Sequence, residues 1–305
     1  MENKLDFNME LSCVLDECRR YMSEGKVASY IPELAKADPT KLGVYLISDN
    51  GSYFAGDCMD TFTVQSIIKP LILLLALKDS GVESVRRLVG VEATGKPFDT
   101  FNYTDLALKN EHINPMINAG AIALCTLIRG NCYKEKTQRL LNFTKTLAKN
   151  DNLEIDSRVY LSEKATGNKN RALAYMLNAY RMIDEDVEEL LDFYFSACSI
   201  KVNCKDLANI AFALSHTEPS DIVSVEDARF INAILSTSGM YDGSGEFALN
   251  VGIPAKSGVG GGIMAVVPSR MGIGVYSPIL DRKGNSSAGK KVLEILSRRM
   301  NLSVF

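Results

Sequence analysis

The sequence predicts an α+β fold in which strands from both ends of the chain form one antiparallel sheet beside helices from its middle. Three observations predict this arrangement. Residues 42–57 alternate like a β-hairpin, about 64–235 follow a period of 3.6 residues, and β-prone runs return after residue 240. Because the strands are not regularly interleaved with helices, an alternating βα repeat is excluded.

Each element follows from a local pattern. The early hairpin consists of LGVYLIS (42–48) and GSYFAGD (51–57) on either side of the turn SDNG. The middle of the chain holds a series of helical patterns, three of them closed by Gly81, Gly130 and Gly239. The residues that follow predict three strands and a last helix, in the runs FALNVGIPAKSG, GGIMAVVPSR, MGIGVYSPIL and SAGKKVLEILSRRM.

These patterns predict a single domain, residues 1–305, with two lobes. The sheet lobe is expected over about 1–65 and 240–305, and the helical lobe over about 66–239. No fixed-period repeat, low-complexity tract or long linker divides the chain. We expect the two lobes to form one compact unit with a ligand-binding cleft between them.

The overall composition excludes several classes of protein. With 46% apolar and 23% charged residues, the 305-residue chain can build a substantial core. Its formal net charge of −3 offers no overall basic field to nucleic acid or anionic lipid. The opening residues lack a signal-peptide pattern, and the longest apolar run, 71–77, is far shorter than the roughly 20 residues of a membrane span. We therefore expect a soluble cytoplasmic protein with neither a nucleic-acid nor a membrane partner.

Cysteine and histidine limit the chemistry further. The seven cysteines are an odd number without a C-x-x-C pair, and we expect reduced, buried thiols at Cys13, Cys18, Cys58, Cys125, Cys132, Cys198 and Cys204. His112 and His216 are the only two histidines, too few for a zinc site rich in histidine or for a histidine-based triad. A nucleophile in this chain is expected to use another base.

A Ser-x-x-Lys motif occurs three times, beginning at Ser23, Ser66 and Ser287, so spacing alone cannot select one. At Ser66 the strand-like TFTV enters a helix, whose start Pro70 fixes because proline is tolerated only in the first turn. The backbone N–H of Ser66 then suits an oxyanion, and Lys69 lies on the same helix face. Burial against PLILLL would lower the pKa of Lys69 and make it a base. An ordinary helix start explains Ser66 equally well on this segment alone.

A second motif supports the reactive interpretation. Lys256-Ser257-Gly258 is the only K-[ST]-G triplet, and S-x-x-K with a later K-T-G is typical of acyl-transfer enzymes of the β-lactamase type. Taken alone, the triplet reads as a turn at the end of a strand. The third motif of those enzymes, S-D-N, occurs only at 48–50, before Ser66 rather than after it, where a hairpin turn explains it.

The whole sequence resembles the serine-dependent glutaminases of the β-lactamase-like superfamily. The resemblance runs from about residue 25 to 290 and rests on the segments VQSIIKP, HINPMINAGAI, LSEKATGNKN, LDFYFSACS, GMYDGSGEFA and GIPAKSGVGGGI. It implies a β-lactamase/DD-peptidase-like fold, hydrolysis of L-glutamine without a metal or organic cofactor, and a homo-oligomer, either a dimer or a tetramer.

The resemblance also implies which residues form the site. Ser66 matches the nucleophile and Lys69 the lysine that activates it. Asn118 matches a substrate-binding asparagine, Glu163 a ligand of the substrate's α-ammonium, and Asn170 a further binding position for the α-carboxylate. A helix cap before AGAIAL remains an alternative for Asn118, and without the resemblance Glu163 would be interpreted as a solvated surface charge.

Five further residues match site positions. We favour Tyr194 as the proton relay that replaces the missing S-D-N motif, and Tyr241 as the residue that closes the pocket. Val259 matches the residue whose backbone N–H completes an oxyanion hole with Ser66. Tyr30 and Gln65 match positions that line the site. Both Tyr194 and Tyr241 would otherwise be interpreted as core or rim aromatic residues.

The predicted reaction is a two-step acyl transfer from glutamine through an ester on Ser66. Two other functions are compatible with the motifs. A serine hydrolase of the same fold that acts on β-lactams or esters would be acylated by penicillin-type probes, and the misplaced S-D-N argues against it. A non-catalytic protein that binds glutamine or glutamate would show affinity without turnover, which an intact Ser66, Lys69 and Tyr194 disfavours.

Overall fold

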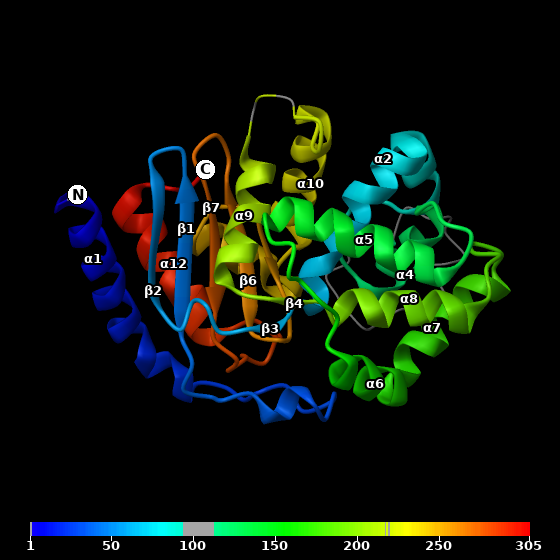
Figure 1. Ribbon diagram of the computed structural model, residues 1–305, viewed down its shortest axis with the longest axis horizontal. Helices are drawn as coiled ribbons and strands as arrows, with labels where there is room; N and C mark the ends of the chain where they lie inside the picture. The colour runs from blue at the N-terminus through cyan, green and yellow to red at the C-terminus, as the bar shows by residue number, and fades with distance from the viewer. Residues whose placement is uncertain (1, 94–112, 217, 219) are drawn as a thin grey trace.

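A five-stranded antiparallel sheet lies beside a larger group of helices in the computed structural model, which describes residues 2–93, 113–216, 218 and 220–305 (Figure 1). The strand order joins the early hairpin to the late strands: β2 (Gly51–Gly56), β1 (Gly43–Ser48), β7 (Met271–Tyr276), β6 (Gly262–Val267) and β5 (Ala255–Ser257). In the central pairing, Val44 of β1 lies opposite Val275 of β7. The predicted α+β fold, with its sheet built from both ends of the chain, is confirmed.

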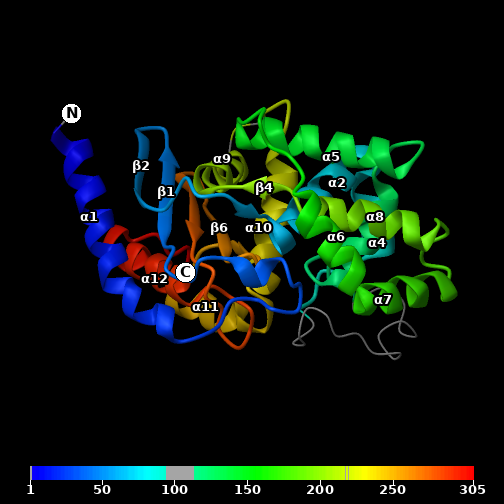
Figure 2. The ribbon, with the colours of Figure 1, turned by 60° about the horizontal axis from the view of Figure 1, so that its bottom comes forward.

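Helices cover both faces of the sheet. Helices α1 (Glu2–Cys18) and α12 (Ser287–Met300) pack on one face, and α9 (Cys204–Ser215) packs on the other (Figure 2). The two faces follow from the period of two in the strands. Ile263 and Ala265 of β6 belong to the core shared with α1 and α12, whereas Met264 belongs to the larger core shared with α9.

The close contact between α9 and the sheet depends on two glycines of β7. A Cβ atom added to Gly272 would lie 2.1 Å from the carbonyl O of Ala208, and one added to Gly274 would lie 2.1 Å from that of Cys204. The helix backbone therefore rests directly on the strand backbone. Although α9 comes from the segment predicted for the helical lobe, it packs against the sheet.

The helical lobe lies to the right of the sheet in Figure 1. Its helices are α2 (Lys69–Leu88), α4 (Asn118–Leu124), α5 (Tyr133–Ala148), α6 (Ser157–Thr166), α7 (Asn168–Ala179) and α8 (Val187–Cys198). Helices α10 (Val225–Ser238) and α11 (Ser244–Asn250) connect the lobe to the sheet. Short pieces complete the description: β3 (Phe62–Thr63), β4 (Lys201–Val202), η1 (Arg19–Ser23), η2 (Leu34–Lys36), η3 (Gln65–Ile68), η4 (Cys125–Leu127) and η5 (Tyr241–Gly243).

Three local expectations differ from the structure. The run FALN belongs to helix α11 and not to a strand, since it contains no β-branched residue and only 255–257 pair with the sheet. Helix α1 was not predicted, although Leu11, Val14, Leu15 and Cys18 have helical spacing and are buried. Gly81 breaks the helical geometry with φ 77°, but the chain resumes the helix and continues to Leu88.

The cysteines and histidines are placed only in part as expected. All seven cysteines are free, but Cys13 and Cys132 are exposed, which the prediction of buried thiols did not anticipate. His216 is exposed at the end of α9, and His112 lies outside the described residues. Across the described ranges, no helix has both the length and the apolar character needed to cross a membrane.

The contact between β7 and α9 gives a testable prediction. Gly272→Ala would push a methyl group into the backbone of Ala208 and Phe212, and we expect it to lower the free energy of unfolding by about 2–3 kcal/mol. Gly245→Ala is the matched control, because an added Cβ there meets nothing within 4 Å and the site is helical. Urea denaturation of both variants makes the comparison; equal stabilities would contradict the close backbone contact.

Candidate active site

Ser66 lies where the sheet lobe meets the helical lobe. Strand β3 leads into η3, which contains Ser66, and α2 begins directly afterwards with Pro70 in its first turn. Gln65, immediately before Ser66, has φ 49°, in the left-handed region that non-glycine residues rarely adopt. Backbone strain of this kind is often found next to reacting groups. The predicted helix start is confirmed, with one 3₁₀ turn added before it.

Lys69 is fully buried and points at Ser66. Its Nζ lies 2.8 Å from Ser66 Oγ and 2.7 Å from Asn118 Oδ1. The other two Ser-x-x-Lys motifs bond elsewhere: Ser23 Oγ donates to the carbonyl O of Arg20, and Lys290 pairs with Asp281. Among the three motifs, Ser66 and Lys69 thus form a serine-lysine pair joined by a hydrogen bond.

Asn118 links the serine-lysine pair to two more helices. Its side chain does not cap α4, the alternative that the sequence left open, although it is the first residue of that helix. Instead its Oδ1 accepts from Lys69, and its Nδ2 donates to Asn170 Oδ1 at 2.8 Å. The Tyr194 hydroxyl lies 3.4 Å from Asn118 Oδ1. Burial raises the pKa of Tyr194 well above its usual value, so its hydroxyl is a donor.

Glu163 is a buried carboxyl group and not the surface charge that its neighbours suggested. Burial raises its pKa from 4.5 to about 8, while Gln65 and the nearby charge of Lys69 act in the opposite direction. In the part of the chain that the structure describes, Glu163 Oε2 has no hydrogen-bond partner. A buried acceptor without a partner is costly, and a cationic group of a ligand would satisfy it.

A second buried lysine approaches from the sheet. Lys256 Nζ donates to the carbonyl O of Ser257 at 2.6 Å and lies 4.3 Å from the ring centroid of Tyr241. The pKa of Lys256 is lowered well below its usual value, first by burial and then by repulsion from Lys69. The Tyr241 hydroxyl donates to the same Ser257 carbonyl at 2.9 Å and contacts the side chain of Ser66. The motif at 256–258 therefore lies near Ser66, with the Tyr241 hydroxyl between them.

The backbone around Val259 runs against the segment that carries Ser66. A Cβ on Gly258 would lie 2.7 Å from the carbonyl O of Val64, and one on Gly260 would lie 2.4 Å from that of Thr63. Val259, between these two glycines, is buried. The glycines are required because the two main chains are in contact, which brings the backbone of Val259 toward Ser66.

A cavity of about 330 Å³ opens beside Ser66. Seven of the predicted site residues line it: Tyr30, Gln65, Ser66, Asn118, Glu163, Asn170 and Tyr194. Lys69 lies behind Ser66, and Tyr241 and Val259 lie outside the lining. The sequence did not single out the other lining residues: Ile31, Thr166, Gly167, Asn168, Lys169 and Cys198. Cys198 follows Tyr194 by one helical turn, a spacing that would have found it.

The S-D-N triplet at 48–50 is not part of this site. Asp49 and Asn50 form the turn between β1 and β2, where Ser48 Oγ donates to the carbonyl O of Gly51. The interpretation of S-D-N as a hairpin turn is confirmed.

Sequence comparisons place this chain among proteins named as glutaminases. The family model described as Glutaminase matches residues 25–305. Curated glutaminases of Clostridium tetani and Clostridioides difficile are 49% and 48% identical, covering 97% and 99% of this chain and 99% and 100% of their own.

Solved structures agree with the sequence comparison. A probable glutaminase from Bacillus subtilis, complexed with 6-diazo-5-oxo-L-norleucine, superposes with a TM-score of 0.89 at 34% identity, covering 98% of this chain and 96% of that chain. A second Bacillus subtilis glutaminase structure, at 33% identity with a TM-score of 0.88, covers 97% of this chain and 99% of that chain and is a covalent complex with 5-oxo-L-norleucine. With a family match over nearly the whole chain and relatives close to half identical, this chain belongs to the glutaminase family.

Proposed function

We propose that this glutaminase hydrolyses L-glutamine to L-glutamate and ammonia through an acyl-enzyme on Ser66, with Lys69 as the base. The observation that carries the proposal is the 2.8 Å contact between Lys69 Nζ and Ser66 Oγ at the wall of a polar cavity. The covalent complex of the Bacillus subtilis relative supports it, since 5-oxo-L-norleucine has the carbon skeleton of a glutamine analogue joined to a protein nucleophile.

The proposed reaction has two steps at Ser66, formation of an acyl-enzyme and its hydrolysis. Lys69 takes the hydroxyl proton as Ser66 Oγ attacks the side-chain carboxamide, and the proton then passes to the departing ammonia. Water next attacks the γ-glutamyl ester, and Oγ regains a proton as glutamate leaves. The backbone N–H groups of Ser66 and Val259 would stabilise the oxyanion formed in each step. Tyr194, whose hydroxyl reaches Asn118, is proposed as the proton relay.

Substrate binding is assigned to the polar lining of the cavity. The carboxylate of Glu163 would bind the substrate's α-ammonium, which the buried Oε2 without a partner supports. Asn118 and Asn170 would hold the carboxamide and the α-carboxylate. Tyr30 and Gln65 line the same cavity, and Tyr241 would close it from the side of Ser257. A homo-oligomer and a cytoplasmic location remain predictions from the resemblance and the composition.

The nucleophile can be tested by a single substitution. We expect Ser66→Ala to reduce ammonia release from L-glutamine by at least about 10³-fold, because no acyl-enzyme can form. Ser23→Ala is the matched control, since Ser23 also begins a Ser-x-x-Lys motif but bonds to Arg20. Ammonia release is measured by a coupled enzyme assay with glutamine and asparagine as substrates, and ring opening of a β-lactam is followed in a separate assay. Full activity of Ser66→Ala would contradict the serine mechanism.

The pKa of Glu163 predicts the pH dependence of catalysis. Since only the carboxylate form attracts an ammonium group, kcat/KM for glutamine should rise with pH up to about 8. Glu163→Gln should raise KM by about 10–100-fold, the effect of losing one charge-assisted hydrogen bond, and should remove this limb of the profile. A pH–rate profile of both proteins is the measurement; an unchanged KM in the variant would exclude Glu163 as the ammonium ligand.

The same pKa predicts how stability varies with pH. The pKa of Glu163 is about 8 in the folded protein, whereas the unfolded chain has the ordinary value of 4.5. Between these two pH values the folded state therefore holds a proton that the unfolded chain releases. Stability contributed by this proton is present below pH 4.5 and is lost as the pH rises toward 8. Glu163→Gln should therefore gain stability relative to the wild type, by a few kcal/mol, between pH 4.5 and pH 8. Thermal unfolding at both pH values, with exposed Glu10→Gln as the control, measures the difference.

A further inference from the structure

Tyr241 reaches the nucleophile from a backbone conformation that tyrosine rarely adopts. Its φ of 56° lies in the left-handed region, at the first residue of the short η5. Its hydroxyl donates to the Ser257 carbonyl and contacts Ser66. A strained residue persists only where its surroundings hold it in place, so the position of this hydroxyl depends on what fixes the backbone of Tyr241.

One side chain bonds to the backbone on both sides of the Tyr241 Cα atom. Ser244 Oγ accepts from the backbone N–H of Met240 at 3.0 Å and donates to the carbonyl O of Tyr241 at 2.8 Å. Ser244 is buried, and it begins α11 without contributing a side-chain cap to that helix. Its hydroxyl therefore bridges the backbone from the N–H of Met240 to the carbonyl of the strained Tyr241.

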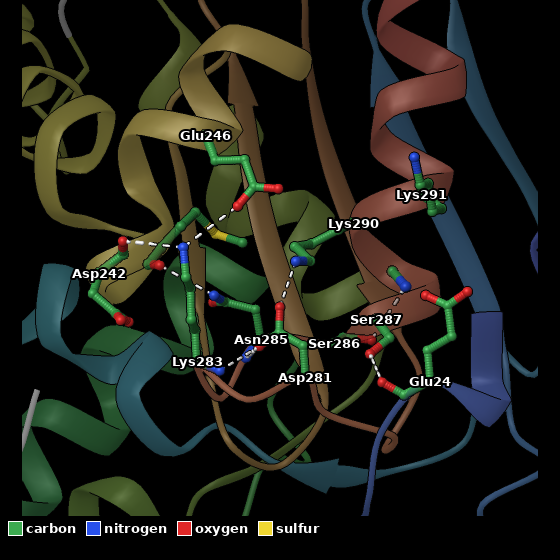
Figure 3. A network of polar contacts seen from close by, with 12 residues as sticks. Glu24, Asp242, Glu246, Asp281, Lys283, Asn285, Ser286, Ser287, Lys290 and Lys291 are labelled. Carbon is green, nitrogen blue, oxygen red and sulfur yellow. Dashed lines mark hydrogen bonds and ion pairs between the residues drawn. The ribbon is translucent and has the colours of Figure 1, made fainter. Parts of the chain in front are cut away.

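A second side chain holds the peptide group directly before Tyr241. Asn285 is almost fully buried, and its Nδ2 donates to the carbonyl O of Met240 at 3.1 Å. Asn285 is itself fixed by Asp281, whose Oδ1 accepts from the backbone N–H of Asn285 at 3.0 Å. Asp281 is paired in turn with Lys290 of α12 (Figure 3). A rigid turn from the C-terminal part of the chain thus anchors the segment that carries Tyr241.

We infer that Ser244 and Asn285 are positioning residues that place the Tyr241 hydroxyl against Ser66 for glutamine hydrolysis. Neither touches the cavity beside Ser66, so both act through Tyr241. The inference rests on the proposed function, because it assigns the Tyr241 hydroxyl a part in the reaction at Ser66. It requires Tyr241 to do more than close the pocket.

The first test compares two serine substitutions of the same kind. Ser244→Ala should lower kcat/KM for glutamine by about tenfold, since small displacements of a reacting group are costly. Ser215→Ala is the matched control: Ser215 is also buried, and its Oγ also donates at 2.8 Å to a carbonyl three residues earlier, that of Phe212. The two variants should lose similar thermal stability, but Ser215→Ala should keep wild-type kcat/KM.

The second test separates positioning from a general loss of structure. In a Tyr241→Phe background the hydroxyl is absent, so Ser244→Ala should change kcat/KM by less than twofold there. Asn285→Ala should behave in the same way, and it provides the test if Ser244→Ala does not fold. A purely structural contribution would instead give the same fold-change in both backgrounds.

Each outcome decides one question. A tenfold loss in the wild type that vanishes in Tyr241→Phe supports the inference. Equal losses in both backgrounds, wild-type activity in Ser244→Ala, or wild-type activity in Tyr241→Phe would each overturn it. A wild-type protein that releases no ammonia from glutamine would instead contradict the proposed function, so the two failures are distinguishable.

Discussion

The contact between Lys69 and its two oxygen partners is the interaction on which the rest of the site depends. An amine with no exposure to water is tolerated only where acceptors replace its hydration, and here Ser66 Oγ and Asn118 Oδ1 do so. Asn118 must then turn its carboxamide away from its own helix, and its Nδ2 fixes Asn170 at the start of α7. Hydrogen bonds that begin at one buried amine thus link three helices, α2, α4 and α7.

A second buried lysine, from the sheet lobe, adds to the electrostatic environment of Lys69. Lys256, also fully buried, comes from β5, while Lys69 comes from α2. The pKa of Lys256 is lowered well below its usual value, first because burial removes the ammonium from water and then because Lys69 repels it. Lys256 donates to the Ser257 carbonyl, the acceptor it shares with the Tyr241 hydroxyl. One carbonyl of β5 therefore holds both side chains beside Ser66.

The sequence predicted the features that depend on a few neighbouring residues. It missed features that depend on contacts between distant parts of the chain. Pro70 located the start of the helix, and the alternation at 42–57 located the hairpin, because both signals act over a few residues. The prediction of a strand at FALN was wrong, because only the pairing with distant strands shows that this strand begins at Ala255. The burial of Glu163 was equally invisible locally, and only the family resemblance placed this carboxyl group in the site. The hydrogen bond from Asn285 to the Met240 carbonyl, which anchors the segment that carries Tyr241, joins residues 45 positions apart in the chain and has no sequence signature.

The pairing of β1 with β7 has a consequence for how the molecule is made. Val44 meets Val275, so the middle of the sheet cannot close until nearly the whole chain has left the ribosome. Until then the inner edge of the N-terminal hairpin exposes backbone groups to any other strand nearby. The Ser66 segment also waits, because the glycines at 258 and 260 that press against it are synthesised almost two hundred residues later. The Ser66 segment therefore cannot take up its final packing before residues 258–260 exist, and the edge of the hairpin stays open to mispairing during that interval.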